Sequence, residues 1–144
     1  MVDRNVVAMK LGELADRIGR VRSHCPDTPE ELAADLDALD IVSFNLLLAV
    51  QACLDLASHL ISDAGWQPVS TARGAIERLE DRGVVSQETA RSLRDAIGLR
   101  NIVAHGYSGV DPQQIHAAAT AGLADLELFA TEVSAWVEGS GATE

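Results

Sequence analysis

The sequence predicts an all-α fold, an antiparallel helical bundle of four long helices and one short helix. Two observations indicate this. Hydrophobic residues make up 47% of the chain but aromatic residues only 3%, with Ala and Leu dominant, which favours helices packed through aliphatic side chains. Apolar residues also recur every three or four positions, and no stretch alternates as a strand does. At 144 residues, we expect a single domain over 1–144, with 138–144 as a frayed tail.

The first helix is predicted from about Asp3 to Ser23. Its apolar residues follow a 4-3-4-3-4 spacing, the pattern of bundle packing, at Val7, Leu11, Leu14, Ile18, Val21 and Cys25. A second helix can begin here, since Thr28 can cap it and Pro29 suits its first position. We expect this second helix to continue without a break to about Asp63.

The second helix is apolar nearly all round from Leu46 to Ala57, which predicts burial on two sides. In a small bundle, one side can face the core and the other a partner chain. Its apolar run from Ile41 to Ile61 is interrupted by polar residues, so we interpret it as a buried helix of a soluble protein. The N-terminus lacks the pattern of a signal peptide, and we expect a cytoplasmic protein with no membrane contact.

Capping residues place the remaining helices. Ser70 or Thr71 can begin a short helix that ends near Asp81, and Ser86 can cap a helix that runs into residues 100–105. Asp111 followed by Pro112 predicts the start of the last long helix.

The net charge of −11 opposes binding to a polyanion, but the charge is unevenly distributed. All eleven basic residues lie in 4–22 and 73–100, so a local basic strip beside residue 100 is possible, although charged helix faces are usually only solvated. Cys25 and Cys53 are too few and too far apart for a disulfide framework or a zinc motif, and we interpret them as buried free thiols. We predict no metal site and no cofactor.

The chemically promising residues gather in the stretch Arg100-Asn101-Ile-Val-Ala-His105-Gly106-Tyr107. Asn101 and His105 are four apart and share a helix face, whereas Arg100 lies about 140° round the axis from His105, a gap that a long side chain can partly close. The stretch would place a permanent cation, an amide and a titratable imidazole near one helix C-terminus. The alternative is a structural cluster in which the Arg and His only satisfy the last carbonyls of the helix.

This stretch resembles the R-x4-6-H signature of the HEPN superfamily, and its form Arg-Asn-x3-His-x-Tyr is most similar to the HepT-like branch. The resemblance extends to Ala49–Ile61, which carries Asp55 at the family's usual acidic position, and to Gly98-Leu-Arg-Asn101 before the motif. Gly106 departs from the family pattern, since relatives often have Asp between the His and the Tyr. The resemblance implies a HEPN-like bundle in which Arg100, His105 and Asn101 are catalytic.

The resemblance also implies a function. The protein would be the toxin of a type VII toxin–antitoxin system, a homodimeric, metal-independent endoribonuclease acting on RNA. A MntA-like nucleotidyltransferase antitoxin would neutralise it by AMPylating Tyr107 and would join it in a larger assembly. A Tyr ring packed on Val103 is a simpler account of Tyr107, and both can hold. The alternative function is a non-catalytic HEPN subunit that binds substrate for, or docks on, a separate nucleotidyltransferase.

Asp55 belongs to a polar stripe with Gln51 and His59, at every fourth position of the second helix. Polar groups in apolar surroundings need partners. The stripe can be an exposed or internally paired face, for example with Asp55 bonded to His59. Alternatively, Asp55 faces Arg100 or His105 and fixes its orientation.

Overall fold

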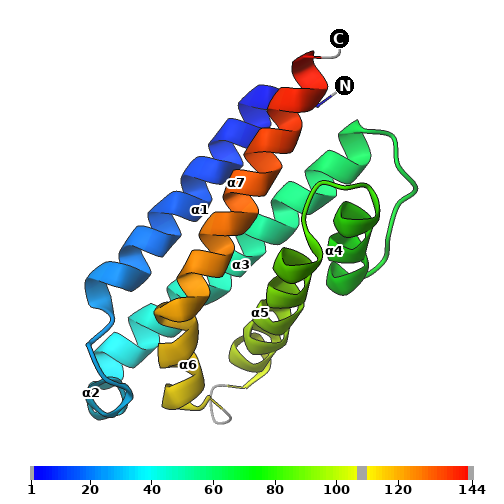
Figure 1. Cartoon of the computed structure of the whole chain (residues 1–144). Helices are drawn as coiled ribbons and strands as arrows, with labels where there is room; N and C mark the ends of the chain where they lie inside the picture. The colour runs from blue at the N-terminus through cyan, green and yellow to red at the C-terminus, as the bar shows by residue number, and fades with distance from the viewer. Residues whose placement is uncertain (1, 107–109, 143–144) are drawn as a thin grey trace.

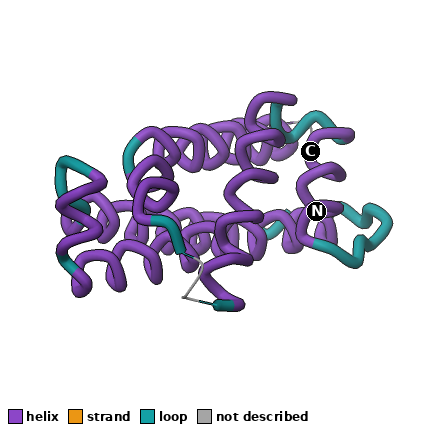
Figure 2. Tube along the Cα trace, turned by 90° about the horizontal axis from the view of Figure 1, so that it is seen from below, coloured by secondary structure: helices purple, strands orange, loops and turns teal. Residues whose placement is uncertain are grey.

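The computed structural model describes residues 2–106 and 110–142, and for residues 141 and 142 it describes the backbone only. The described chain is an antiparallel bundle of four long helices, which confirms the predicted fold class (Figure 1). The long helices are α1 Arg4–His24, α3 Leu36–Asp63, α5 Gln87–His105 and α7 Ala121–Ala142. Successive long helices run in opposite directions, and Figure 2 shows that helices make up most of the described chain.

Two of the predicted long helices are each divided into two. The helix expected over 29–63 is α2 Pro29–Ala34 followed by α3, because Asp35 ends the first and caps the second by accepting the backbone N–H of Ala38. The last helix is α6 Pro112–Ala119 followed by α7. Thr120 lies at this break, where its hydroxyl bonds back to the carbonyl of His116 at 2.7 Å.

The other helices begin where the capping residues in the sequence predicted. Thr28 and Asp111 are the caps of α2 and α6, and Thr71 caps the short helix α4 Ala72–Asp81. At the other end of the chain, α7 remains helical to Ala142, so helix extends into the segment expected to be a frayed tail.

The helix α5 is anchored at its N-terminus from α7. Ser86 caps it by accepting the backbone N–H of Thr89. Glu132 of α7 accepts the backbone N–H of Ser86 at 2.6 Å through one carboxylate oxygen, and the hydroxyl of Thr89 through the other. This carboxylate therefore joins two helices and satisfies donors at the positive end of α5.

Helix α3 is the centre of the core. Cys53, Ala57 and Leu60 have no exposed surface, and α3 contacts α1, α4, α5, α6 and α7. It is the one helix in the described chain that is long and apolar enough to cross a membrane, but 61% of its most apolar window is buried inside the bundle. This agrees with the interpretation of the segment as a core helix of a soluble fold.

A small aromatic cluster holds the loop after α3 against α7. The rings of Trp66 and Trp136 meet edge to face with centroids 5.5 Å apart, and the guanidinium of Arg82 lies 5.2 Å from the centre of the Trp66 ring. The cluster lies near the end of α3, which is opposite in the bundle to the end where α5 stops (Figure 1).

Candidate active site

The last turns of α5 carry the predicted motif. The helix ends at His105, and the backbone N–H of Gly106 bonds to the carbonyl of Ile102 at 3.2 Å. Gly106 has an extended backbone with φ of 178°, so its conformation does not require glycine. His105 is exposed, while Arg100 and Asn101 are half-buried. Tyr107, the predicted AMPylation position, lies outside the described residues.

Arg100 extends from α5 to α3 and is held on two edges. Its Nε and Nη2 atoms donate to Oδ1 of Asn101, at 3.1 and 2.7 Å, and its Nη1 donates to Oε1 of Gln51 at 3.0 Å. An arginine has five N–H groups, so two remain available for an anion. Asn101 therefore orients the arginine through its amide oxygen.

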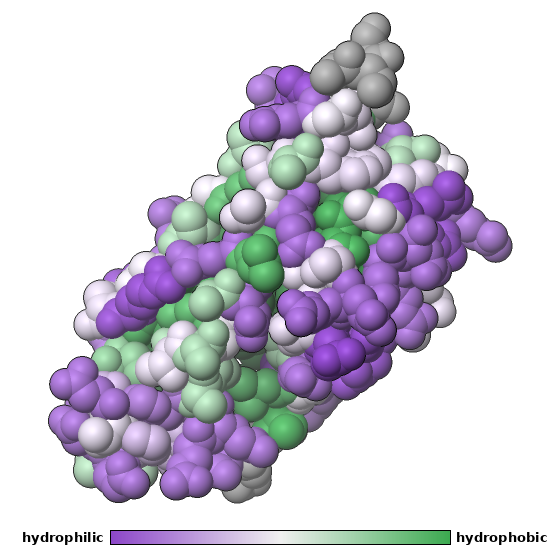
Figure 3. Space-filling model, in the orientation of Figure 1, coloured by the Kyte–Doolittle hydropathy of each residue, from purple (hydrophilic) through white to green (hydrophobic). Residues whose placement is uncertain are grey.

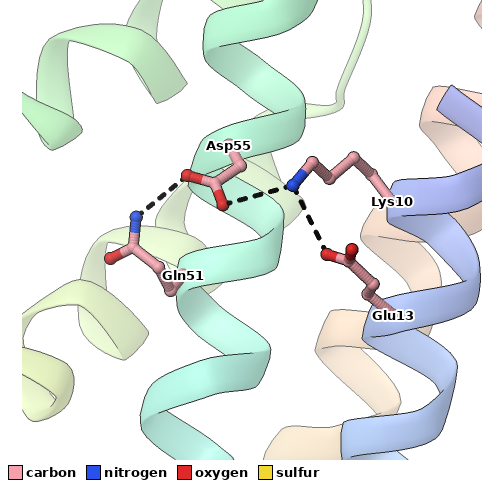
Figure 4. A network of polar contacts seen from close by, with 4 residues as sticks. All are labelled: Lys10, Glu13, Gln51 and Asp55. Atoms are coloured by element: carbon pink, nitrogen blue, oxygen red, sulfur yellow. Dashed lines mark hydrogen bonds and ion pairs between the residues drawn. The ribbon is translucent and has the colours of Figure 1, made fainter. Parts of the chain in front are cut away.

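The polar stripe of α3 continues this network away from the motif. Gln51 Nε2 donates to Asp55 Oδ1 at 3.0 Å, and the other carboxylate oxygen of Asp55 lies 3.7 Å from Lys10 Nζ on α1 (Figure 4). Lys10 also pairs with Glu13, one turn along α1.

The suggested pairing of Asp55 with His59 is wrong, because Nε2 of His59 lies 2.9 Å from a carboxylate oxygen of Asp63 instead. Asp55 is connected to Arg100 through Gln51. The sequence pattern placed Gln51 on the same helix face as Asp55 but did not predict a role for it.

Arg100 separates two hollows of different character. The larger, about 510 Å³, lies between α3, α5, α6 and α7 and is lined mainly by aliphatic side chains. On the face of the molecule seen in Figure 3, patches of apolar surface lie among more hydrophilic surroundings. The smaller, about 260 Å³, is polar and includes Gln51, Asp55, Ser58, Ser70 and Thr71.

Three arginines of the basic segment 73–100 lie at the larger hollow. Arg73, Arg94 and Arg100 all line it, against the two carboxylates of Asp95 and Asp125. Arg94 is partly neutralised by Glu80, 3.5 Å away. The charges around the hollow are therefore roughly balanced, whereas the whole chain carries a net charge of −11, so an anion is repelled less here than by the average surface.

His105 lies about 7.5 Å along the helix axis from Arg100 and, among the described residues, lines neither hollow. The structure thus brings Arg100 and Asn101 together and leaves the imidazole at the exposed helix end. Chemically, the arrangement offers an oriented guanidinium for a phosphate, with an exposed imidazole at the end of the same helix.

Comparison with known proteins gives this geometry a context. A family model described as ribonuclease HepT-like matches residues 14–133. Among similar proteins, an mRNA nuclease HepT of Shewanella oneidensis is 23% identical over 91% of this chain and 98% of its own. A tRNA nuclease HepT of Aphanizomenon flos-aquae is 26% identical over 64% of this chain and 63% of its own.

Among solved structures, a tri-AMPylated HEPN toxin of Shewanella oneidensis in complex with its MNT antitoxin has the same fold. The TM-score is 0.85 at 24% identity, over 94% of this chain and 99% of the other. The family match covers α5 with the whole motif, and the structural likeness covers nearly the whole bundle. The chain therefore belongs to the HepT-like ribonuclease family of HEPN proteins.

Proposed function

We propose that this protein is the toxin of a HepT/MntA-type toxin–antitoxin pair and acts as a metal-independent endoribonuclease. The observation that carries the proposal is the guanidinium of Arg100, held between α3 and α5 beside a cleft, five residues before an exposed imidazole. Membership of a family that contains nucleases of mRNA and of tRNA supports RNA as the substrate. We further propose that it acts in the cytoplasm.

The proposed reaction uses the 2′-hydroxyl of the RNA as the nucleophile. The imidazole of His105 takes the 2′-hydroxyl proton, the 2′-oxygen attacks the adjacent phosphorus, and the bond from phosphorus to the 5′-oxygen breaks. Arg100 binds the phosphate through its two remaining N–H groups and stabilises the charge that develops there. Asn101 orients Arg100 and can donate its Nδ2 to the same phosphate.

The leaving 5′-oxygen needs a proton from a second group, and one imidazole cannot easily serve both as base and as acid. We therefore propose a two-fold homodimer in which the two motifs face one cleft, so that the partner's His105 protonates the leaving oxygen. The exposed side chains of Phe44 and Ile102, on α3 and α5, offer apolar surface for such a contact.

Tyr107 is the proposed off-switch. AMP groups added by a MntA-like nucleotidyltransferase would place bulky anions two residues from His105, where they would repel and obstruct RNA. A solved relative with a tri-AMPylated HEPN toxin bound to its antitoxin supports this assignment. Incubation with ATP and the cognate nucleotidyltransferase should raise the intact mass in AMP-sized steps, and Tyr107→Phe should abolish the increase.

The first test is cleavage of a labelled RNA in excess EDTA by the wild type, by His105→Ala and by a control, His24→Ala. His24 lies at the end of α1, where its Nδ1 is 2.9 Å from the carbonyl of Arg20. Activity that survives EDTA and the control but is lost in His105→Ala would support the proposal. A wild type of unmodified mass that cleaves no RNA would favour the docking-subunit alternative.

A further inference from the structure

We propose that Gln51 is the positioning residue for Arg100, and that Asp55 and Lys10 act on the site only through it. The expected effects on RNA cleavage rest on the proposed ribonuclease function, whereas the hydrogen bonds that hold Arg100 do not depend on it. The polar contacts form one chain from α1 through α3 to α5, in the order Lys10, Asp55, Gln51 and Arg100.

The first step is the need for a second holding point on Arg100. A free arginine side chain has many rotamers, and ordering it costs conformational entropy. Asn101 engages the Nε and Nη2 edge from the same helix, but Nη1 is fixed by Gln51 from the neighbouring helix. Contacts from two helices determine where the guanidinium lies relative to the cleft, so the remaining N–H groups are presented in one direction.

The second step is the orientation of the Gln51 amide. An amide can present either its oxygen or its nitrogen, and only the oxygen can accept from a guanidinium. Asp55 lies one turn further along α3 and accepts from Nε2 of Gln51, which directs Oε1 toward Arg100. Lys10 stands beside the other oxygen of Asp55 and helps to hold the carboxylate on the far side of the amide (Figure 4).

The third step is the chemical reason for an amide at position 51. A carboxylate in direct contact with Arg100 would form an ion pair that competes with a phosphate for the guanidinium. A neutral amide holds the group without neutralising it. The negative charge of Asp55 is kept one side chain further away, next to Lys10.

Two substitutions at Gln51 separate these roles. Gln51→Met keeps the volume but removes both hydrogen bonds, so we expect kcat to fall by about 10- to 100-fold as the guanidinium loses its alignment. Gln51→Glu keeps the acceptor but neutralises Arg100, so we expect a raised KM. The salt dependence of RNA binding should also become shallower by about one phosphate contact.

Gln87 offers a matched control at the exposed first position of the same helix as Arg100, about 20 Å from it along the axis. Gln87→Met and Gln87→Glu make the same chemical changes there and should leave cleavage unaltered. In an Arg100→Lys background, adding Gln51→Met should change the rate by less than about twofold, because the pair acts as one unit. A merely structural Gln51 would lower the rate equally in both backgrounds, and that result would overturn the proposal.

A second readout does not depend on activity. The Nη1–H signal of Arg100 in low-temperature ¹⁵N NMR can be assigned by its loss in Arg100→Lys, and its exchange with solvent should accelerate in Gln51→Met, which removes its acceptor, but not in Gln87→Met. Unchanged exchange in Gln51→Met would refute the positioning role even in an active enzyme. If the wild type cleaves no RNA while the exchange still responds, the positioning role stands and the ribonuclease function fails.

Discussion

Replacing Glu132 by Ala should destabilise the bundle measurably, because this carboxylate anchors α5 from α7. Its two oxygens accept the backbone N–H of Ser86 and the hydroxyl of Thr89, at the end of α5 opposite the motif. Thr89 is only 1% exposed, so its hydroxyl cannot readily turn to water. The oxygen of this hydroxyl still accepts from the Ser86 hydroxyl at 3.1 Å, but its own O–H and the Ser86 backbone N–H both lose their acceptor.

The magnitude follows from these contacts. Hydrogen bonds to a charged group contribute about 1.5–3 kcal/mol each, and an anion at a helix N-terminus adds a further few tenths. Because Ser86 is exposed, water can replace the carboxylate at its N–H, and that bond contributes little. We therefore expect Glu132→Ala to cost about 2 kcal/mol in the free energy of unfolding, mostly from the lost bond of buried Thr89. For a chain of this size, that lowers the melting temperature by about 6 °C. Glu132→Gln retains one acceptor oxygen and should lose roughly half as much.

Urea denaturation followed by far-UV circular dichroism measures the effect, with the slope m unchanged if the unfolded state is unaffected. Glu138→Ala, an exposed substitution on the same helix, is the control and should stay within about 0.5 kcal/mol of the wild type. If Glu132→Ala is no less stable than this control, the carboxylate does not anchor α5.

Two further predictions concern groups with shifted pKa. Burial raises the pKa of both thiols, and Cys53 is fully buried while Cys25 is partly exposed, so a thiol reagent at pH 8 should label Cys25 slowly and Cys53 only after denaturation. Equal labelling of both in the native protein, seen by mass spectrometry, would contradict this. The hydrogen bond from Arg22 lowers the pKa of Glu127 below its ordinary value of 4.5, so the stabilisation is present above that pH and lost as the pH falls through the lower folded value. Because both side chains are exposed, Glu127→Gln should lose a small amount of stability at pH 7 and less at pH 3, which denaturation at the two pH values can compare.

The helix starts were predictable because capping is local. A side chain at the cap bonds to a backbone N–H two or three residues later, as Thr71 and Ser86 do, so the signal lies within a few letters of the sequence. The breaks at Asp35 and Thr120 were missed because no Pro stands at either break and the apolar spacing continues across both, although Gly122 follows the second break by two residues. The weaker signal was a second capping residue inside each predicted helix.

The site was predictable only along its own helix. The motif stretch identified Arg100 and Asn101 as neighbours, and their bond requires only adjacent positions on α5. The contact between Arg100 and Gln51 joins residues 49 apart, and its register depends on how α3 and α5 pack. Periodicity placed Gln51 and Asp55 on one face, but it could not tell which of the two would meet the arginine.

The tryptophan cluster makes intrinsic fluorescence a reporter of one end of the bundle only. The chain has two tryptophans, and both belong to the contact between the loop after α3 and α7. Intrinsic fluorescence therefore reports the undocking of that loop and the separation of Arg82 from the indole, at the end of the bundle remote from Arg100 and His105. Tryptophan emission therefore does not report the geometry around Arg100, even in a Gln51 variant. Ligand binding at that site has to be followed with an extrinsic label placed on α5.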